Sequence, residues 1–401
     1  MSKYKVSIIV PGRWHAFYQA QVLQEYGLLE KLVTSYPKFK TREWGIHDSH
    51  VESLFWHYIS TMFLWKFGGE ALDIRLGGHL HRLFGKLAMR HLGNANIVHG
   101  WAGVSLFTMY RKQELGVSAV VLDRGSAHRL SQDSILAEEY EQNGLCWPKR
   151  PIRQTQFECL EYEHADAITV PSVFVRKTFL DHEVDERKIF QNGYGVNLEQ
   201  FFPQLRRHTG FKVIYAGSLS LRKGIQYLVE GFLRANILNS ELMFVGGMTE
   251  EIRKSVDFSD SRIRHLGHLP QKELPEIYRS GDIFVLPSLE EGQAMVQFQA
   301  LACGLPLICT TNTGGEDLLM KSGVVSEDTA KHIKEFKAGF VVRPRDSFAI
   351  AECLLKLSKN VDILSEKKNA AVALCADDFS WMAHGLRNIA LYEQLLNGAL
   401  Q

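Results

Sequence analysis

The residues from Pro287 to Pro306 offer the clearest chemistry in the sequence, which is anion binding beside a carboxylate. An apolar strand, Ile283–Leu286, leads into a short loop that carries Glu290, Glu291 and Gly292, and an apolar helix follows. The first N–H groups of a helix have no partner inside it, and glycine allows close approach, so this helix start favours a phosphate. A phosphate cradle beside Glu291 predicts a phosphorylated sugar as the ligand. An ordinary strand-loop-helix corner with a solvated glutamate pair is the alternative.

The elements that must position this loop alternate between strands and helices. In the first half we expect strands at residues 6–10, 32–36, 97–99, 117–122 and 167–172, the last being the final strand of that half. The pattern then restarts, with strands at residues 211–217, 242–247, 263–267, 283–286 and 305–309. This alternation predicts parallel α/β organisation in two Rossmann-like domains, joined in the turn-rich segment from residue 192 to 203. Neither half has a complete G-x-G-x-x-G, so a dinucleotide site has little support.

Length and composition exclude several classes of protein. The 401 residues suggest two domains, and 45% hydrophobic with 23% charged residues is typical of soluble globular proteins. A net charge of +1 gives no drive towards nucleic acid. The six cysteines show neither a C-x-x-C pair nor metal-ligand spacing, as expected of reduced cytosolic thiols. The start of the chain has no signal-peptide pattern, and no run approaches the ~20 apolar residues of a membrane span, so we expect a cytoplasmic protein.

Four separate blocks occur in one order along the chain. They are A-D-A-I-T-V-P-S at residues 165–172, the segment from Tyr194 to Pro203, the loop from Gly217 to Gly224, and the segment from Asp282 to Pro306. Together they resemble the family 4 glycosyltransferases, which are retaining, metal-independent enzymes of the GT-B fold. The resemblance implies two Rossmann-like domains facing each other across a cleft, at residues 1–200 and 201–379. It also implies a closing helix, at about residues 380–401, that packs back on the first domain.

By this resemblance, the loop after residue 217 binds the donor diphosphate. Lys223 would pair with the diphosphate, because a lysine that leaves a glycine loop can reach it as a point charge. Ser218 replaces the arginine of the family, and Arg222 is a substitute whose guanidinium fork suits phosphate oxygens. Glu291 matches the first of the family's paired glutamates, near the sugar ring. Gln299 replaces the second and keeps an acceptor for a ribose hydroxyl without its charge.

The helix start completes the donor site implied by the resemblance. Gly292 and the backbone amides of Gln293, Ala294 and Met295 would contact the phosphates. Glu290, by contrast, is expected to be a solvated neighbour that takes no part.

The first domain offers fewer candidates. Gly12 and Arg13 follow the opening strand, where they could face the donor phosphates, although an arginine bound only to water is an equal alternative. Two histidines compete for the cleft histidine of the family, and we rank His128 above His99. Either could donate to the leaving phosphate. A structural histidine is the alternative for both.

An aromatic insert, from about Trp44 to Leu92, interrupts the first domain. Basic residues lie within or after its segment from Val51 to Phe67, namely Lys66, Arg75, Arg82, Lys86 and Arg90. We expect a helical pair that packs its aromatic residues into the core. A contact with a membrane surface and a wall for the acceptor are the alternatives.

The resemblance implies transfer of a sugar from a nucleoside diphosphate sugar to an acceptor hydroxyl with retention of configuration. The catalytic residues would be Glu291, Lys223 and His128, with neither a cofactor nor a metal. The acceptor would be a glycan or a lipid-linked compound in cell-surface polysaccharide or glycolipid synthesis, with the inner membrane face as an alternative location. Two rival functions are an epimerase or phosphorylase on the same fold and a non-catalytic sugar-nucleotide-binding protein.

Overall fold

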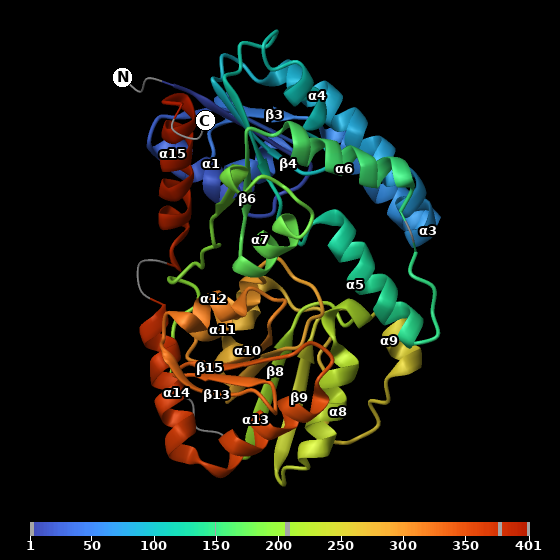
Figure 1. The fold of residues 1–401 in the computed structure, drawn as a ribbon, viewed down its shortest axis with the longest axis vertical. Coiled ribbons are helices and arrows are strands. Elements are labelled where there is room, and N and C mark those ends of the chain that lie inside the picture. Colours follow the sequence, from blue (N-terminus) through green and yellow to red (C-terminus); the bar gives the residue numbers. More distant parts are fainter. Residues whose placement is uncertain (1–3, 149, 205–208, 376–378, 399–401) are drawn as a thin grey trace.

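Two sheets, one from each half of the chain, form the framework of the molecule (Figure 1). The computed structural model describes residues 4–148, 150–204, 209–375 and 379–398. The first sheet lies above the second in Figure 1, and helices cover both. This is the α/β architecture predicted from the alternation of strands and helices.

The first sheet has seven parallel strands in the order β3-β2-β1-β4-β5-β6-β7. The strands in the middle of this order, β1, β4 and β5, are buried along their whole length, as in parallel sheets covered on both faces. The expectation that residues 167–172 form the last strand is wrong, because β7 follows β6. At three residues, β7 is too short to leave a clear apolar pattern. The bounds are β1 Val6–Val10, β2 Leu29–Thr34, β3 Val51–Ser53, β4 Ile97–Trp101, β5 Ala119–Asp123, β6 Ala167–Val170 and β7 Ile189–Gln191.

The second sheet has eight strands in the order β10-β9-β8-β11-β12-β15-β14-β13. Strand β14 pairs antiparallel with both β13 and β15, and β15 is parallel to β12. The sequence analysis did not predict these three strands. For β13 the reason is that it is exposed throughout and therefore leaves no pattern of buried apolar residues. The bounds are β8 Phe211–Ala216, β9 Ser240–Val245, β10 Ile263–His265, β11 Ile283–Leu286, β12 Leu307–Thr310, β13 Val324–Asp328, β14 Ile333–Phe336 and β15 Gly339–Val342.

Helices follow most strands of both sheets. In the first half they are α1 Ala16–Glu25, α2 Lys38–Arg42, α3 Phe55–Ala88, α4 Leu106–Tyr110, α5 Arg129–Gln142, α6 Ile152–His164 and α7 Val173–Leu180. In the second half they are α8 Ile225–Ala235, α9 Glu250–Ser255, α10 Leu274–Arg279, α11 Met295–Ala302, α12 Gly315–Met320, α13 Ser347–Lys359 and α14 Val361–Leu374. The last helix, α15 Trp381–Leu396, returns to the first half, where it lies beside α1 (Figure 1).

The return of α15 depends on close backbone packing at the junction between the halves. The ring of Trp381 stacks on Tyr18 of α1 with centroids 4.2 Å apart. Val196 and Ser380 form an isolated parallel bridge, so the two connecting segments run side by side. Gly195 has no room for a side chain there, because a Cβ atom would lie 2.6 Å from the Trp381 nitrogen.

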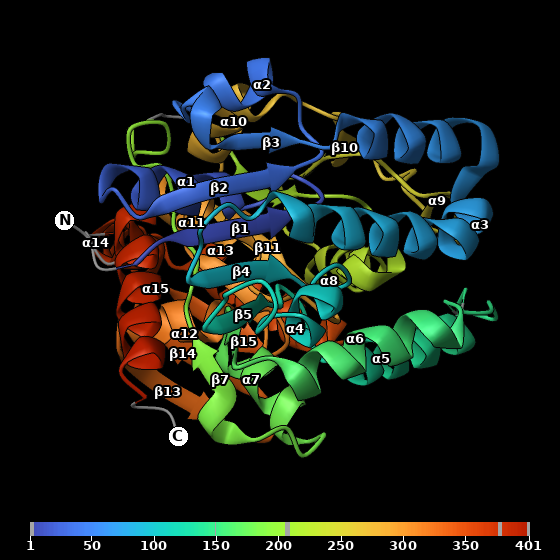
Figure 2. The ribbon, with the colours of Figure 1, turned by 90° about the horizontal axis from the view of Figure 1, so that it is seen from above.

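Helix α3 is a hairpin of two helical arms rather than one rod. Gly69 has a φ of +62°, which breaks the helix between residues 55–68 and 70–88. The rings of His57 and His81 lie 5.0 Å apart, so the arms run alongside each other, as Figure 2 shows. None of the described helices is long and apolar enough to cross a membrane.

Only the base of this hairpin enters the core. His57, Phe84 and Ala88 are buried, whereas Phe63 and Trp65 in the first arm are 62% and 71% exposed. The expectation that the insert packs its aromatic residues into the core is therefore wrong for the outer part of the hairpin. The arms extend beyond the sheet (Figure 2), so their outer turns have no core to pack against.

The packing of α15 on α1 can be tested by filling its closest contact. A Cβ atom at Gly385 would lie 2.5 Å from a methyl carbon of Val22, so Gly385→Leu should force the two helices apart. We expect a loss of about 1–3 kcal/mol in unfolding free energy, measured by chemical denaturation. Gly247→Ala is the control, because a Cβ atom there would meet nothing within 4 Å. Equal stability of the Gly385→Leu variant and the wild type would contradict this packing.

Candidate functional site

The predicted diphosphate loop forms a single tight turn after β8. Residues Leu221–Lys223 make a 3-10 turn, and Gly224 ends it with a φ of +67°. A Cβ atom at Gly224 would lie 2.1 Å from the carbonyl oxygen of Pro287, so only glycine lets the two segments approach this closely. Strands β8 and β11 are neighbours in the sheet, and their carboxyl ends therefore bring this turn beside the Glu290–Gly292 loop.

The two cations of the turn face the two carboxylates of the loop. Lys223 Nζ donates to Glu291 Oε1, while Arg222 Nη1 lies 3.4 Å from Glu290 Oε2 and 3.6 Å from Glu291 Oε1. The amide of Leu289 also donates to the Arg222 carbonyl at 2.9 Å. Burial alone would raise the pKa of Glu291, but the charges of Lys223 and Arg222 outweigh burial and lower it. The structure thus brings three sequence-predicted residues, Lys223, Arg222 and Glu291, into one charged cluster.

Glu290 is part of this cluster, and the expectation that it is merely a solvated neighbour is wrong. Its side chain is fully buried. Its carboxylate accepts hydrogen bonds from the Ala127 amide at 2.9 Å and from Gln132 Nε2 at 2.8 Å, both in the first half. Glu290 is buried because the loop before α5 closes over it, and the sequence around it does not reveal this long-range contact.

The start of α11 also touches the first half. A Cβ atom at Gly292 would lie 1.8 Å from the Gly125 carbonyl oxygen, and the Gly292 carbonyl accepts from Ser172 Oγ at 2.7 Å. Gln293 Oε1 accepts from the Tyr194 amide at 2.8 Å. Gly292 is therefore required by this close approach between the halves.

The amides at the helix start are available to an anion. Ala294 occupies the N-cap position of α11, and no side chain at this position accepts a hydrogen bond from the first amides of the helix. Within the described part of the chain, no hydrogen-bond acceptor pairs with the amide of Ala294 or of Met295. The Met295 side chain is 38% exposed.

The two residues that depart from the family pattern lie at different places. Ser218 is exposed just after β8, and its carbonyl accepts from the Tyr215 hydroxyl at 2.8 Å. Gln299 is buried in α11, where its Oε1 accepts from the Tyr278 hydroxyl at 3.2 Å. The acceptor predicted to serve a ribose hydroxyl is therefore already engaged inside the second half.

The loop after β1 does not join the charged cluster. The Gly12 carbonyl accepts from Thr34 Oγ1 at 3.2 Å. The Arg13 guanidinium lies over Trp44, 4.8 Å from the ring centroid, and thus stacks on an aromatic residue of the same half. Among the described residues, no hydrogen bond or ion pair joins Arg13 to Lys223 or to Glu291.

His128 is a capping residue of α5. Its Nδ1 accepts from the Leu130 amide at 3.4 Å, and its ring stacks on His182 with centroids 4.1 Å apart. Burial, with the nearby charges of His182 and Arg124, lowers the pKa of His128 to about 3. Its ring is neutral and directed into an aromatic cluster of the first half. No hydrogen bond or ion pair among the described residues joins it to the charged cluster.

A buried His-Asp-His group lies at the junction of the two halves, and the sequence analysis proposed only one of its members, His99. His15 Nε2 lies 3.0 Å from Asp123 Oδ2, and His99 Nε2 lies 3.6 Å from the same oxygen. Burial would raise the pKa of Asp123, but the charge of His15 and its hydrogen bond, together with nearby His99, outweigh burial and lower the pKa. The other ring nitrogen of His99, Nδ1, is within hydrogen-bond distance of Gln19 Nε2 and lies 2.7 Å from the Tyr392 hydroxyl.

This group is next to the charged cluster through Tyr194. The Tyr194 ring lies 4.4 Å from the His15 ring, and both Asp123 and Glu291 contribute to the raised pKa of Tyr194, after burial. The signal that could have found the group is strand order, since β1, β4 and β5 are adjacent. His15 follows β1, His99 lies in β4 and Asp123 ends β5. Side chains at the ends of adjacent parallel strands meet.

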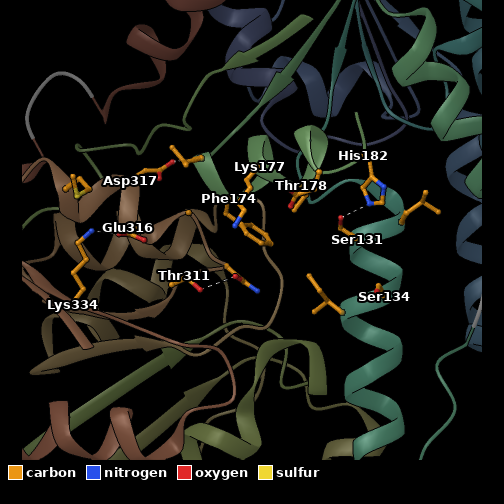
Figure 3. Close-up of a pocket in the computed structure, with 17 residues that line it drawn as sticks. Ser131, Ser134, Phe174, Lys177, Thr178, His182, Thr311, Glu316, Asp317 and Lys334 are labelled. Carbon is orange, nitrogen blue, oxygen red and sulfur yellow. Dashed lines mark hydrogen bonds and ion pairs between the residues drawn. The ribbon is translucent and has the colours of Figure 1, made fainter. Parts of the chain in front are cut away.

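A groove of about 870 Å³ lies between α5 and α7 on one side and the segment from β12 to α12 on the other (Figure 3). Its charges are mixed, with Lys177 and Lys334 beside Asp181, Glu316 and Asp317. Neither Lys223 nor Glu291 lines it. The groove is therefore separate from the charged cluster, although the Asn312 carbonyl on its wall accepts from the Glu291 amide at 2.9 Å.

Carboxylates hold the two halves together at the sides of the site. Glu139 of α5 is fully buried and accepts from Gln226, Tyr227 and Arg345 of the second half at 2.6 to 2.9 Å. Asp317 of α12 accepts from the Val173 amide at 2.7 Å, at the start of α7. With Glu290, these carboxylates make the interface between the halves polar.

Comparison with known proteins gives the class of protein. Residues 210–360 match the family model described as group 1 glycosyl transferases. The chain is 25% identical over 190 residues to the O-antigen chain mannosyltransferase B of Escherichia coli, covering 45% of each protein. It is 25% identical over 225 residues to the D-inositol 3-phosphate glycosyltransferase of Paenarthrobacter aurescens, covering 51% of this chain and 52% of that one. The matches thus span about half the length of these relatives.

The solved structures extend the likeness of fold to the whole chain. Sucrose-phosphate synthase from Thermosynechococcus elongatus aligns with a TM-score of 0.71 at 17% identity, over 99% of this chain and 100% of that one. Anabaena HepE in complex with UDP and glucose aligns with a TM-score of 0.66 at 12% identity, over 97% and 99%. The chain is therefore a GT-B protein that resembles the group 1 glycosyltransferases, as its sequence blocks predicted.

Arg345 contacts one buried and one exposed carboxylate of α5, Glu139 and Glu138, and these two residues allow a matched pair of variants. Glu139→Gln removes a buried negative charge that accepts hydrogen bonds from Arg345 and Tyr227. The variant should therefore lose about 1–3 kcal/mol of unfolding free energy. Glu138 pairs with the same Arg345 at 3.3 Å but is exposed, so Glu138→Gln should cost less than about 0.5 kcal/mol. Chemical denaturation of both variants checks this. Equal losses would contradict the assignment.

Asp317 should make stability depend on pH. Burial, the largest cause, raises the pKa of Asp317 to about 6, from an ordinary 3.8. The folded protein then keeps a proton that the unfolded chain loses, so this group's contribution to stability falls as pH rises from about 4 to 6. Asp317→Asn should therefore gain melting temperature relative to the wild type across this range, measured by thermal unfolding at several pH values. A difference that does not change with pH would refute the shift.

Proposed function

We propose that the protein is a retaining, metal-independent glycosyltransferase that moves a sugar from a nucleoside diphosphate sugar to an acceptor hydroxyl. The observation that carries the proposal is the cluster of Lys223 and Arg222 against Glu291, beside a helix start with open amides. It lies within the region that matches the group 1 glycosyl transferases. The structural neighbour HepE is described in complex with UDP and glucose, which supports a nucleotide-sugar donor.

The chemistry of the cluster suits a departing diphosphate. The diphosphate would take the place of Glu291 as the partner of Lys223, with Arg222 beside it as a bidentate donor. The amides of Ala294 and Met295 add fixed dipoles aimed at the same anion. Glu291, released from Lys223, would then accept hydrogen bonds from the sugar hydroxyls. Two side-chain cations and open amides stabilise negative charge on the leaving group through electrostatics alone, so we expect no metal and no cofactor.

Donor binding requires the halves to separate and close again. The Gly125 carbonyl fills the space above Gly292, and Glu290 is covered by Ala127 and Gln132. A donor entering from the cleft would displace these contacts, and closure around it would complete the site. In the closed state, the His15-Asp123 pair and Tyr194 would lie on the first-domain side of the sugar.

The acceptor that we propose is a glycan or a lipid-linked compound, in synthesis of a cell-surface polysaccharide or glycolipid. The E. coli relative, described as an O-antigen chain mannosyltransferase, supports this role. The groove between α5, α7 and α12 offers polar side chains of both charges to a hydroxyl-rich acceptor.

One observation favours a second candidate function, a non-catalytic protein that binds a sugar nucleotide. Gln299 lacks a charge and already accepts a hydrogen bond from Tyr278, so ribose recognition through this residue would differ from that of the family pattern. Calorimetry with UDP and other nucleoside diphosphates, followed by product analysis with glycan acceptors, separates the two. Binding without any transfer or donor hydrolysis supports the second candidate. Donor consumption without acceptor or nucleotide release indicates an epimerase instead.

Lys223→Ala should abolish the electrostatic stabilisation of the leaving diphosphate. We expect donor turnover, with or without acceptor, to fall by about a hundredfold to a thousandfold, measured by release of the nucleoside diphosphate. Lys212→Ala is the control, since this lysine pairs with Glu241 on β9 and does not contact the cluster. Unchanged turnover in the Lys223→Ala variant would remove the central assignment.

A further inference from the structure

We propose that His15 is the general base of the sugar transfer and that Asp123 positions it. This role rests on the function proposed above, because it names the group that takes the proton from the acceptor hydroxyl. His15 follows β1 and Asp123 ends β5, and the carboxyl ends of parallel strands are where open α/β sheets bind their ligands.

Asp123 meets two hydrogen-bond partners at one carboxylate oxygen. Oδ2 lies 3.0 Å from His15 Nε2 and accepts from Thr169 Oγ1 at 3.1 Å. The other oxygen, Oδ1, is buried and has no hydrogen-bond partner among the described residues. A buried carboxylate that depends on donors at Oδ2 favours the form of His15 with its proton on Nε2.

The other ring nitrogen of His15, Nδ1, remains available to a substrate. It has no hydrogen-bond partner within the described part of the chain, and it keeps some contact with solvent although the residue is only 4% exposed. His15 is also the N-cap residue of α1, yet its side chain makes no capping hydrogen bond. With the proton on Nε2, Nδ1 carries a lone pair and can take a proton from a hydroxyl group.

The backbone just before His15 is strained. Trp14 has a φ of +36°, in the left-handed region that is unfavourable for a residue with a side chain. The turn at Trp14 sets the direction in which the chain leaves β1, so it orients the residue that follows. Strained backbone of this kind is found preferentially at functional sites.

Two neighbouring histidines are less suited to this role. The Nδ1 atom of His99 is already within hydrogen-bond distance of two side chains, its Nε2 faces Asp123 at 3.6 Å, and the residue is fully buried. His384 has both ring nitrogens engaged, with Nδ1 2.9 Å from the Gly193 carbonyl and Nε2 3.3 Å from Asn388 Nδ2. His15 is therefore the histidine of this group whose ring can meet a ligand.

The pair lies beside the cluster that would hold the donor. Tyr194 connects the two, because its ring is 4.4 Å from the His15 ring and its amide donates to Gln293 Oε1 at the start of α11. Lys223 and Arg222 would lower the basicity of the diphosphate oxygens that they bind. A separate base on the first-domain side is then a better acceptor for the hydroxyl proton.

In the transfer step, the acceptor oxygen forms a bond to the anomeric carbon of the sugar, and the bond from that carbon to the diphosphate oxygen breaks. The electron pair of the broken bond leaves with the diphosphate, beside Lys223. The proton of the acceptor hydroxyl passes to His15 Nδ1, and Asp123 stabilises the imidazolium until solvent removes the proton. The role of His15 concerns the proton alone and does not change the configuration proposed above.

Transfer kinetics of matched variants test this role, with UDP-glucose and GDP-mannose as donors and octyl glucoside and octyl mannoside as acceptors. We expect His15→Ala to lower kcat by about a hundredfold or more, with the Kd for UDP and GDP unchanged in calorimetry. Asp123→Asn should act similarly, because an amide that donates to Nε2 leaves the proton on Nδ1. His50→Ala is the control, since His50 Nδ1 lies 3.0 Å from the Glu30 carbonyl and its ring does not contact the pair.

Added bases separate a general base from a structural ring. Free imidazole should restore part of the transfer by His15→Ala, and the rescue should increase with base strength across methyl- and fluoro-substituted imidazoles. Circular dichroism confirms that each variant is folded. NMR spectra of the protein with ¹⁵N-labelled histidine, assigned with His15→Ala, should show the proton of neutral His15 on Nε2.

Three results would overturn the role of His15 alone. They are a proton on Nδ1 in the wild type, an unchanged kcat in His15→Ala while the wild type transfers sugar, and a loss of donor affinity as large as the loss of rate. A wild type that transfers no sugar and binds neither UDP nor GDP would overturn the function proposed above, and the role of His15 with it.

Discussion

The pairing of Lys223 and Arg222 with Glu291 and Glu290 is the interaction on which the site depends. It joins the turn after β8 to the loop after β11, and these strands are neighbours in the second sheet. Buried charges are stable only when they are paired, so each side of the cluster requires the other. The same pairing keeps two cations beside the open amides at the start of α11, and cations and open amides together favour an anion.

The first half completes the cluster by covering it. The loop from Gly125 to Ala127 lies over Gly292 and Glu290, and Arg124 shapes that loop by donating to the Ala127 carbonyl at 3.0 and 3.1 Å. The junction between the halves is fixed at Gly195 and Ser380, where two connecting segments run together. The position of the first half relative to the second is thus set by polar contacts at the cleft and by backbone packing at the junction.

The sequence predicted what depends on local pattern. The buried strands β1 and β11 were predicted at their observed bounds, because apolar runs ended by Pro11 and Pro287 leave little ambiguity. That Lys223 and Glu291 lie close together could be predicted, because each belongs to a sequence block that directly follows a strand of the same sheet. The exposed strand β13 was missed, since an edge strand that faces solvent has no apolar periodicity.

What the sequence could not predict depends on contacts across long separations. Glu290 is buried by residues more than 150 positions earlier, and its own neighbours suggest a solvated glutamate. His128 lies next to the loop that covers the cluster, yet its ring turns inward to cap α5 and stack on His182. The Asp123 group forms only after the sheet order brings β1, β4 and β5 together.

The polarity of the interface between the halves fits the opening that we propose for donor binding. An apolar interface of this kind would cost free energy whenever it was exposed to water. If the halves part as proposed, Glu139, Asp317 and Glu290 would exchange protein donors for water, so much of their interaction energy would be recovered. For the donor binding that we propose, an interface held by a few carboxylates is therefore better suited than a continuous hydrophobic core.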